Sequence, residues 1–145
     1  CIPNISTLSK EVEVTRISLL NYLFYLKKAQ ALLLLDKETS GIKQLAKPEK
    51  IYLGNTNYAY ALGGDKTDIG NVRETFFLNQ MQVKHSVTYS SKVDFTVNGE
   101  YSFEIGGKNK TQQQLAGVEQ GYLALDNIEV GFRNEIPLWL FGMTY

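Results

Sequence analysis

Asp94 and Glu104 are the two carboxylates whose spacing points most directly to chemistry. They lie in two stretches of alternating apolar and polar residues, 93–97 and 101–105, which flank Asn98-Gly99. An Asn-Gly pair between two such stretches predicts a β-hairpin. If both carboxylates lie on one face of that hairpin, their oxygens can hold a hard divalent cation such as Mg²⁺ or Mn²⁺.

The register of the hairpin decides whether the two carboxylates share a face. A two-residue turn would place Asp94 and Glu104 on opposite faces. A three-residue loop at 97–99, with its glycine in the left-handed conformation, pairs Thr96 with Glu100 and puts both carboxylates on the polar face. The apolar face then carries Val93, Phe95, Tyr101, Phe103 and Ile105. Because a shift of one residue would expose this apolar set, burial favours the three-residue loop.

The candidate catalytic set comprises Glu74, Asp94, Glu104 and Lys108. A divalent cation held by Asp94 and Glu104 would activate water and stabilise a phosphoryl transition state. Lys108 would orient that water or neutralise developing charge. The alternative is that these are solvated charges on the open face of a hairpin, with Glu74 completing a capping box that Asn71 begins. Spacing alone favours this structural alternative.

Several other chemistries are excluded by the residues that the chain lacks. Gly106-Gly107-Lys108-Asn109 has neither the upstream glycine nor the hydroxyl residue of a P-loop, so we expect no ATP site in this fragment. His85 is the one histidine, which rules out a histidine pair for a metal. Cys1 is the one cysteine, which rules out an internal disulfide and indicates a reducing, cytoplasmic compartment.

Charge and hydropathy exclude a global attraction to nucleic acid or membrane. The 145 residues carry 15 basic and 15 acidic side chains, which cancel, so any contact with nucleic acid must come from a local patch. The longest apolar run, residues 31–35, is far too short to span a bilayer. We therefore expect no membrane partner.

The first third of the chain predicts a helix-turn-helix followed by a two-stranded wing. Asn4 would cap a short helix over 4–12, and Thr15 a longer helix to about Ala29. The expected buried stripe of the longer helix is Ile17, Leu20, Leu23, Phe24 and Leu26. Residues 32–35 and 51–53 predict the two strands of the wing, joined by a polar loop over 36–50.

In the functional interpretation, the second helix binds DNA through the residues that it exposes. These residues are Arg16, Ser18, Asn21, Tyr22, Tyr25, Lys27 and Lys28. The alternative is that this module only packs against a neighbouring domain, since the helix is not strongly basic.

The rest of the chain predicts a sheet covered by helices, an α/β (α+β) fold. We expect helices over 55–62, 71–84 and 111–118, and strands over 87–89, 122–126 and 136–141, besides the hairpin. The helix over 71–84 would bury Val72, Phe76, Phe77 and Met81.

Four stretches, in this order, carry a resemblance to a known family. They are Pro-Glu-Lys-Ile-Tyr-Leu-Gly-Asn-Thr at 48–56, Gly-Asn-Val-Arg-Glu-Thr-Phe-Phe at 70–77, Val-Asp-Phe at 93–95 and Phe-Glu-Ile at 103–105. The chain resembles the C-terminal region of a prokaryotic family of AAA-type ATPases. In that family a P-loop ATPase domain precedes a winged helix and a restriction-endonuclease-like (PD-(D/E)XK-type) domain of unknown function.

The resemblance covers nearly the whole chain and implies its organisation. Residues 1–53 would be a partial winged-helix module and 54–145 the restriction-endonuclease-like domain, with the ATPase part preceding residue 1. The nuclease-like superfamily uses a glutamate on an early helix, an aspartate opening one strand and Glu-x-Lys on the next. These positions match Glu74, Asp94 and Glu104. The expected lysine position holds Gly106, and the nearest candidates are Lys108 and Lys110, of which Lys108 would reach back over a glycine bulge.

Two functions follow as expectations. The first is an accessory C-terminal module of an AAA-type ATPase that binds DNA or a protein partner, with a nuclease-like site that has lost its activity. The second is a Mg²⁺- or Mn²⁺-dependent nuclease with Asp94 and Glu104 as metal ligands, Glu74 outside the ligand set and Lys108 as the displaced lysine. The implied partners are the upstream ATPase domain of the same polypeptide and DNA, and homo-oligomer formation stays open.

Overall fold

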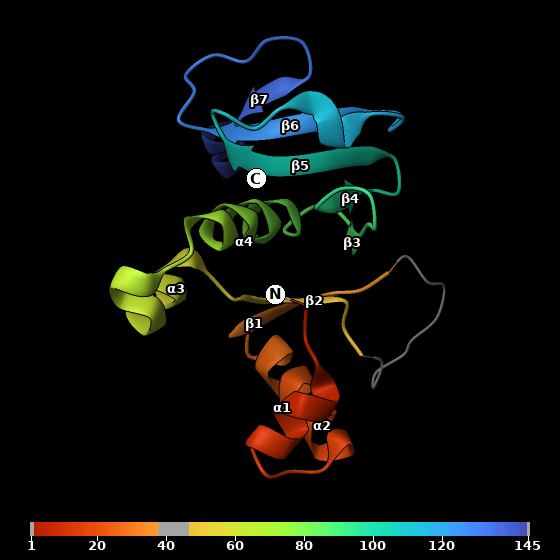
Figure 1. The fold of residues 1–145 in the computed structure, drawn as a ribbon, viewed down its shortest axis with the longest axis vertical. Coiled ribbons are helices and arrows are strands. Elements are labelled where there is room, and N and C mark those ends of the chain that lie inside the picture. Colours follow the sequence, from red (N-terminus) through yellow and green to blue (C-terminus); the bar gives the residue numbers. More distant parts are fainter. Residues whose placement is uncertain (1, 38–46, 145) are drawn as a thin grey trace.

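The computed structural model describes residues 2–37 and 47–144 and has a mixed α/β (α+β) fold (Figure 1). Helices α1 (Ile5–Glu11) and α2 (Arg16–Lys28) pack on an antiparallel pair of strands, β1 (Leu32–Leu35) and β2 (Lys50–Leu53). Helices α3 (Thr56–Gly63) and α4 (Ile69–Met81) follow. A five-stranded sheet completes the chain, so the predicted fold class is confirmed.

The five-stranded sheet has the order β3-β4-β5-β6-β7. Its strands are β3 (Val87–Tyr89), β4 (Phe95–Val97), β5 (Tyr101–Gly107), β6 (Gly121–Asp126) and β7 (Glu135–Pro137). The pairs β3–β4 and β4–β5 are antiparallel, while β6 runs parallel to both β5 and β7. Helix α4 lies between this sheet and the β1–β2 pair, and contacts both β5 and β2 (Figure 1). In the described parts of the chain, no helix has the length and apolarity needed to cross a membrane.

The predicted caps of the first two helices are confirmed. The Asn4 side chain accepts a hydrogen bond from the backbone N–H of Thr7, and Thr15 accepts one from Ser18, both at 3.1 Å. The predicted stripe of α2 is partly wrong, because Ile17 is 66% exposed and Leu26 is 43% exposed. Only one side of α2 is covered by α1 and β1. That side carries Leu19, Leu20 and Leu23.

Strands β1 and β2 form a layer that is shared by two apolar clusters. Leu32, Leu34 and Ile51 pack with α1 and α2. The alternate residues, Leu33, Leu35 and Tyr52, belong to the main core with α4 and the large sheet. The predicted boundary between residues 53 and 54 falls at the end of this shared layer. Most of the predicted 36–50 loop lies outside the described residues.

Helix α4 begins earlier than predicted. Its cap is Asp68, whose side chain accepts a hydrogen bond from the backbone N–H of Gly70 at 2.9 Å. The predicted capping box of Asn71 and Glu74 is therefore wrong. Glu74 lies inside α4, beyond the first turn, whose N–H groups need hydrogen-bond acceptors. Its side chain therefore has no capping role.

The hairpin confirms the predicted left-handed glycine but corrects the register. Thr96 pairs with Ser102 instead of Glu100, so the loop is 98–100 and the predicted register is wrong by two residues. Asn98 and Gly99 both have positive φ angles, 54° and 70°, which moves the turn one residue further along the chain. Since side chains alternate with a period of two, this error leaves their faces unchanged within the paired strands.

Val93 is an exception to the predicted alternation. Residues 91–94 form a bend before β4, so Val93 does not share a face with Phe95. It packs instead with Leu115, Leu123 and Leu125 in a separate cluster.

The C-terminal predictions are partly wrong. The helix expected over 111–118 is one 3₁₀ turn, Gln112–Leu115, after which Gly117 has a positive φ of 73°. The strand expected over 136–141 ends at Pro137 and continues as a 3₁₀ helix, Leu138–Met143. Proline has no N–H with which to extend the strand pairing.

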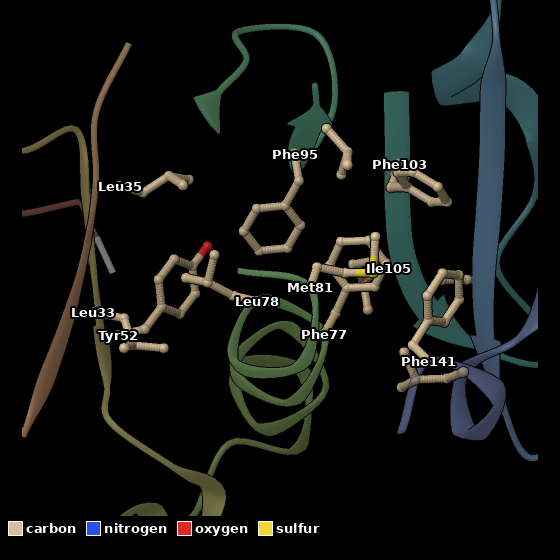
Figure 2. Close-up of a cluster of buried hydrophobic side chains, with 13 residues drawn as sticks. Leu33, Leu35, Tyr52, Phe77, Leu78, Met81, Phe95, Phe103, Ile105 and Phe141 are labelled. Atoms are coloured by element: carbon tan, nitrogen blue, oxygen red, sulfur yellow. The ribbon is translucent and has the colours of Figure 1, made fainter. Parts of the chain in front are cut away.

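Aromatic rings fill the main core between α4 and the large sheet (Figure 2). Phe77 of α4 lies at the centre, with ring-centroid distances of 5.3 Å to Phe95, 5.0 Å to Phe103 and 4.8 Å to Phe141. Phe95 directly follows Asp94, and Phe103 directly precedes Glu104. The core therefore holds in place the backbone that carries both carboxylates.

Candidate functional site

Five charged side chains form a row of alternating sign at the edge of the main core. In order they are Glu74, Lys50, Asp94, Lys110 and Glu104, and successive nitrogen–oxygen distances are 3.5, 3.3, 3.7 and 2.5 Å. They come from α4, β2, the residue before β4, the turn after β5, and β5. Residues far apart in the sequence thus meet in one row.

Asp94 is the centre of the row. Its Oδ1 faces Lys50, while its Oδ2 faces Lys110 and accepts a hydrogen bond from the backbone N–H of Ile105 at 3.0 Å. In return, the backbone N–H of Asp94 donates to Oε2 of Glu104 at 3.1 Å. This reciprocal pair of hydrogen bonds fixes the two predicted metal-ligating carboxylates relative to each other, so their geometry is set by backbone groups rather than by flexible side chains.

Glu74 is held at one end of the row by strand β2. Its Oε2 accepts a hydrogen bond from the Tyr52 hydroxyl at 2.6 Å and lies 3.5 Å from the Lys50 ammonium. Burial raises the pKa of Tyr52 above its usual range, and the hydrogen bond to Glu74 raises it further, so the phenol stays protonated and donates. Lys50 and Tyr52 were missed by the sequence analysis, although their spacing of two on a strand places them on one face.

Lys110 takes the place that the sequence analysis gave to Lys108. Its Nζ donates to the backbone carbonyl of Ile105 at 2.7 Å and lies beside Glu104 and Asp94. Its stem crosses Gly106, where a side chain on that residue would collide with it. Lys108 is exposed in the turn that leads to Lys110. Of the two lysines that follow β5, the one that the structure brings to Asp94 and Glu104 is therefore Lys110.

Glu104 is the most buried member of the row, with 3% of its surface exposed. Burial raises the pKa of its carboxyl above the usual value, and the negative charge of Asp94 adds to this. The hydrogen bond from Lys110 acts in the opposite direction without cancelling the effect. The fold therefore loses stability when Glu104 ionises, which is typical of a residue kept for function.

Replacing Glu104 with glutamine is expected to shift stability in a pH-dependent way. A carboxyl whose pKa is raised in the folded state contributes stability below its unfolded pKa, and that contribution is lost as the pH rises through the folded pKa. Glutamine does not ionise and avoids this loss. The free energy of unfolding of the variant, relative to the native chain, should increase between about pH 4 and about pH 7. Urea denaturation at both pH values measures this, and a constant difference would contradict it.

No family model, curated protein or solved structure matches this chain. Function must therefore be inferred from the residues of the site. Membership of the AAA-type ATPase family stays a prediction.

The oxygens around Lys110 fit the requirements of a hard cation. Oxygens of Asp94 and Glu104 and the carbonyl of Ile105 converge on the ammonium at 3.7, 2.5 and 2.7 Å. Carboxylate and backbone carbonyl oxygens are the ligands that Mg²⁺ and Mn²⁺ prefer. Among the described residues, no three side chains of Asp, Glu, His or Cys are grouped to hold a metal. The donor set is thus two carboxylates and one carbonyl.

The predicted DNA-binding residues lie on the other side of the β1–β2 layer from the row of charges (Figure 1). Arg16, Tyr22, Tyr25, Lys27 and Lys28 are exposed on α2, and Ser18 and Asn21 are half-buried. The Ser18 hydroxyl is engaged with Thr15 at 2.9 Å. The structure therefore does not bring the predicted catalytic and DNA-binding sets together.

A hollow between β1, α3 and α4 is also separate from the row. It is lined by residues that include Gln30, Asn55, Tyr58, Asn79 and Gln82, and none of the five charged side chains borders it. The candidate site is thus identified by its charges and hydrogen bonds, and this hollow is not part of it.

Proposed function

We propose that this chain carries a divalent-cation-dependent phosphodiesterase site of the nuclease type, within an accessory module of a cytoplasmic AAA-type ATPase. The row of charges that links Glu74, Asp94 and Glu104 through two lysines is the observation that carries this proposal. Half-buried ion pairs contribute little net stability, so a fold gains little by assembling five of these groups for structure alone. Proteins keep charged groups that are costly to desolvate mainly where those groups serve a function.

The chemistry proposed is the hydrolysis of a phosphodiester. A water oxygen bonds to phosphorus, the bond to one ester oxygen breaks, and that leaving oxygen takes up a proton. A cation bound by Asp94, Glu104 and the Ile105 carbonyl would lower the pKa of the attacking water and neutralise charge on the phosphoryl group. The ammonium group of Lys50, and that of Lys110 once it has left the cation's ligands, would stabilise further negative charge there. Glu74, held by Tyr52, would orient Lys50.

The test is cleavage of nucleic acid by the folded chain with and without metal. Single-stranded, linear duplex and circular DNA, and RNA, would be incubated with Mg²⁺ or Mn²⁺, with EDTA in parallel. Cleavage that requires the metal is the expected result. Cleavage that persists in EDTA, or no cleavage of any substrate by a chain shown to be folded, would contradict the proposal.

A second candidate is a module that binds DNA or a protein partner without cleaving it. It is supported by the ion pairs of the row. Each carboxylate already lies beside a lysine ammonium, so the carboxylates are neutralised without a metal ion. It is also supported by α2, on which Tyr22 is 52% and Tyr25 is 63% exposed and which also carries exposed Arg16 and Lys28. Exposed aromatic and basic side chains together are common at nucleic-acid interfaces.

Replacing Arg16 and Lys28 together with alanine tests this second function. If both contact phosphates, the slope of log affinity against log salt concentration should fall by about two, because each lost phosphate contact removes about one released counterion. Fluorescence anisotropy with labelled DNA between about 50 and about 200 mM salt measures the slope. The matched control replaces Lys66 and Lys84, which are exposed elsewhere. Equal slopes in both double variants would exclude α2 as the contact.

A further inference from the structure

The Lys110 ammonium occupies the position where the donor set would place a cation. Its Nζ contacts Oε1 of Glu104 and the carbonyl of Ile105 and lies near Oδ2 of Asp94. The other lysine of the row, Lys50, contacts Asp94 through the opposite oxygen and reaches Glu74 instead of Glu104. Only one of the two lysines therefore stands between the proposed metal ligands.

The local backbone delivers Lys110 to this position. A turn after β5 is closed by a hydrogen bond from the N–H of Lys110 to the carbonyl of Gly107 at 3.0 Å. The side chain then folds back across Gly106, which has no side chain to obstruct the stem. Gly106 is the residue at which the nuclease-like pattern expects its lysine, so the ammonium returns to that point from four residues further along the chain.

We infer that Lys110 is an intramolecular competitor of the divalent cation, and that a metal ion binds between Asp94 and Glu104 only when the Lys110 ammonium leaves that position. The inference rests on the proposed function for the identity of the cation site. An ammonium in contact with these oxygens and a divalent cation coordinated by them cannot share the space, and their charges repel strongly when partly buried. Metal affinity of the native chain is therefore reduced by the free energy of the Lys110 contacts.

The same competition couples metal binding to the binding of an anion. An ammonium that has left the carboxylates needs a new negative partner, and a phosphate of the nucleic-acid backbone can supply one. A polyanion that attracts Lys110 would therefore raise the affinity for metal, and by linkage the metal would raise the affinity for the polyanion. The site would then load its cation mainly when substrate is present.

Replacing Lys110 with methionine tests the competition directly. Methionine keeps most of the apolar stem over Gly106 but removes the ammonium. Isothermal titration calorimetry with Mn²⁺ should show a Kd about tenfold lower for Lys110→Met than for the native chain. Lys50→Met is the matched control, because it removes the same charge from the same row without vacating the position between Glu104 and Ile105. An equal gain in both variants would overturn the inference, since it would reflect net charge alone.

Gly106→Ala provides a second variant in which no charge is removed. The added methyl group would collide with the Lys110 stem and displace its ammonium, so Mn²⁺ affinity should again rise. Unchanged Mn²⁺ affinity in a folded Gly106→Ala chain would overturn the inference even if Lys110→Met fails to fold. Calorimetry also separates this inference from the proposed function. Tighter Mn²⁺ binding by the two variants, without cleavage by the native chain, supports the competition and rejects the nuclease. Metal-dependent cleavage with unchanged Mn²⁺ affinity in both variants supports the nuclease and rejects the competition.

Discussion

Replacing Asp94 with asparagine is expected to lower metal-dependent cleavage by at least about a hundredfold while the chain stays folded. Asp94 supplies charge both to the proposed cation and to the two lysines beside it. Asparagine keeps an oxygen that can accept the hydrogen bond from the N–H of Ile105, so the backbone arrangement survives. Alanine would leave that N–H without its acceptor and is the less informative change.

The stability of the Asp94→Asn chain should fall by only about 1–2 kcal/mol. Lys50 retains Glu74 and Lys110 retains Glu104, so neither ammonium is left without an opposite charge. Cleavage rates and urea denaturation would be measured on the same preparations.

Asp126→Asn is the matched control for Asp94→Asn. Asp126 forms an ion pair with Arg73 at 2.9 Å, outside the row of charges, so the same chemical change removes a comparable contact. This control should cleave like the native chain. If Asp94→Asn also cleaves like the native chain, or if both variants lose activity equally, Asp94 is not part of the catalytic machinery.

The sequence predicted the faces of the hairpin better than its pairing. Asp94 and Glu104 do converge, although the register is wrong by two residues. A shift of two leaves Glu104 on its face of β5, and Asp94, which lies in the bend before β4, is held beside it by hydrogen bonds. The prediction failed for Val93 because alternation holds only within a strand, and a bend precedes β4. Periodicity therefore locates residues on a regular element but says nothing of the irregular backbone beside it.

The remaining errors concern contacts that the local sequence does not encode. Lys50 and Tyr52 reach Glu74 because β2 packs against α4, an association set by the shared core rather than by any motif. The prediction that Lys108 reaches the carboxylates was wrong because the geometry of one turn decides between Lys108 and Lys110. The glycines at 106 and 107 did signal an unusual local backbone, but not which lysine would use it.

Replacing Phe77 with alanine is expected to destabilise the chain by about 3–5 kcal/mol, the largest loss that we predict for a single core residue. Phe77 is fully buried and touches three other aromatic rings, so alanine would leave a cavity that the two flanking layers cannot close. Since single domains have total stabilities of only about 5–15 kcal/mol, much of the variant should be unfolded near physiological temperature. Urea denaturation followed by circular dichroism measures the loss.

Phe132→Ala removes the same side chain from a site that is 68% exposed and should change stability by less than about 0.5 kcal/mol. Similar losses in the two variants would mean that the aromatic core is not the centre of the fold.

The milder Phe77→Leu should remain folded, so its effect on metal binding can be measured separately from loss of the fold. Phe77 contacts the rings next to Asp94 and Glu104 and lies one helical turn from Glu74. If these contacts position the carboxylates, Phe77→Leu should weaken Mn²⁺ binding although it removes no charge, because the three carboxylates are held by one shared core.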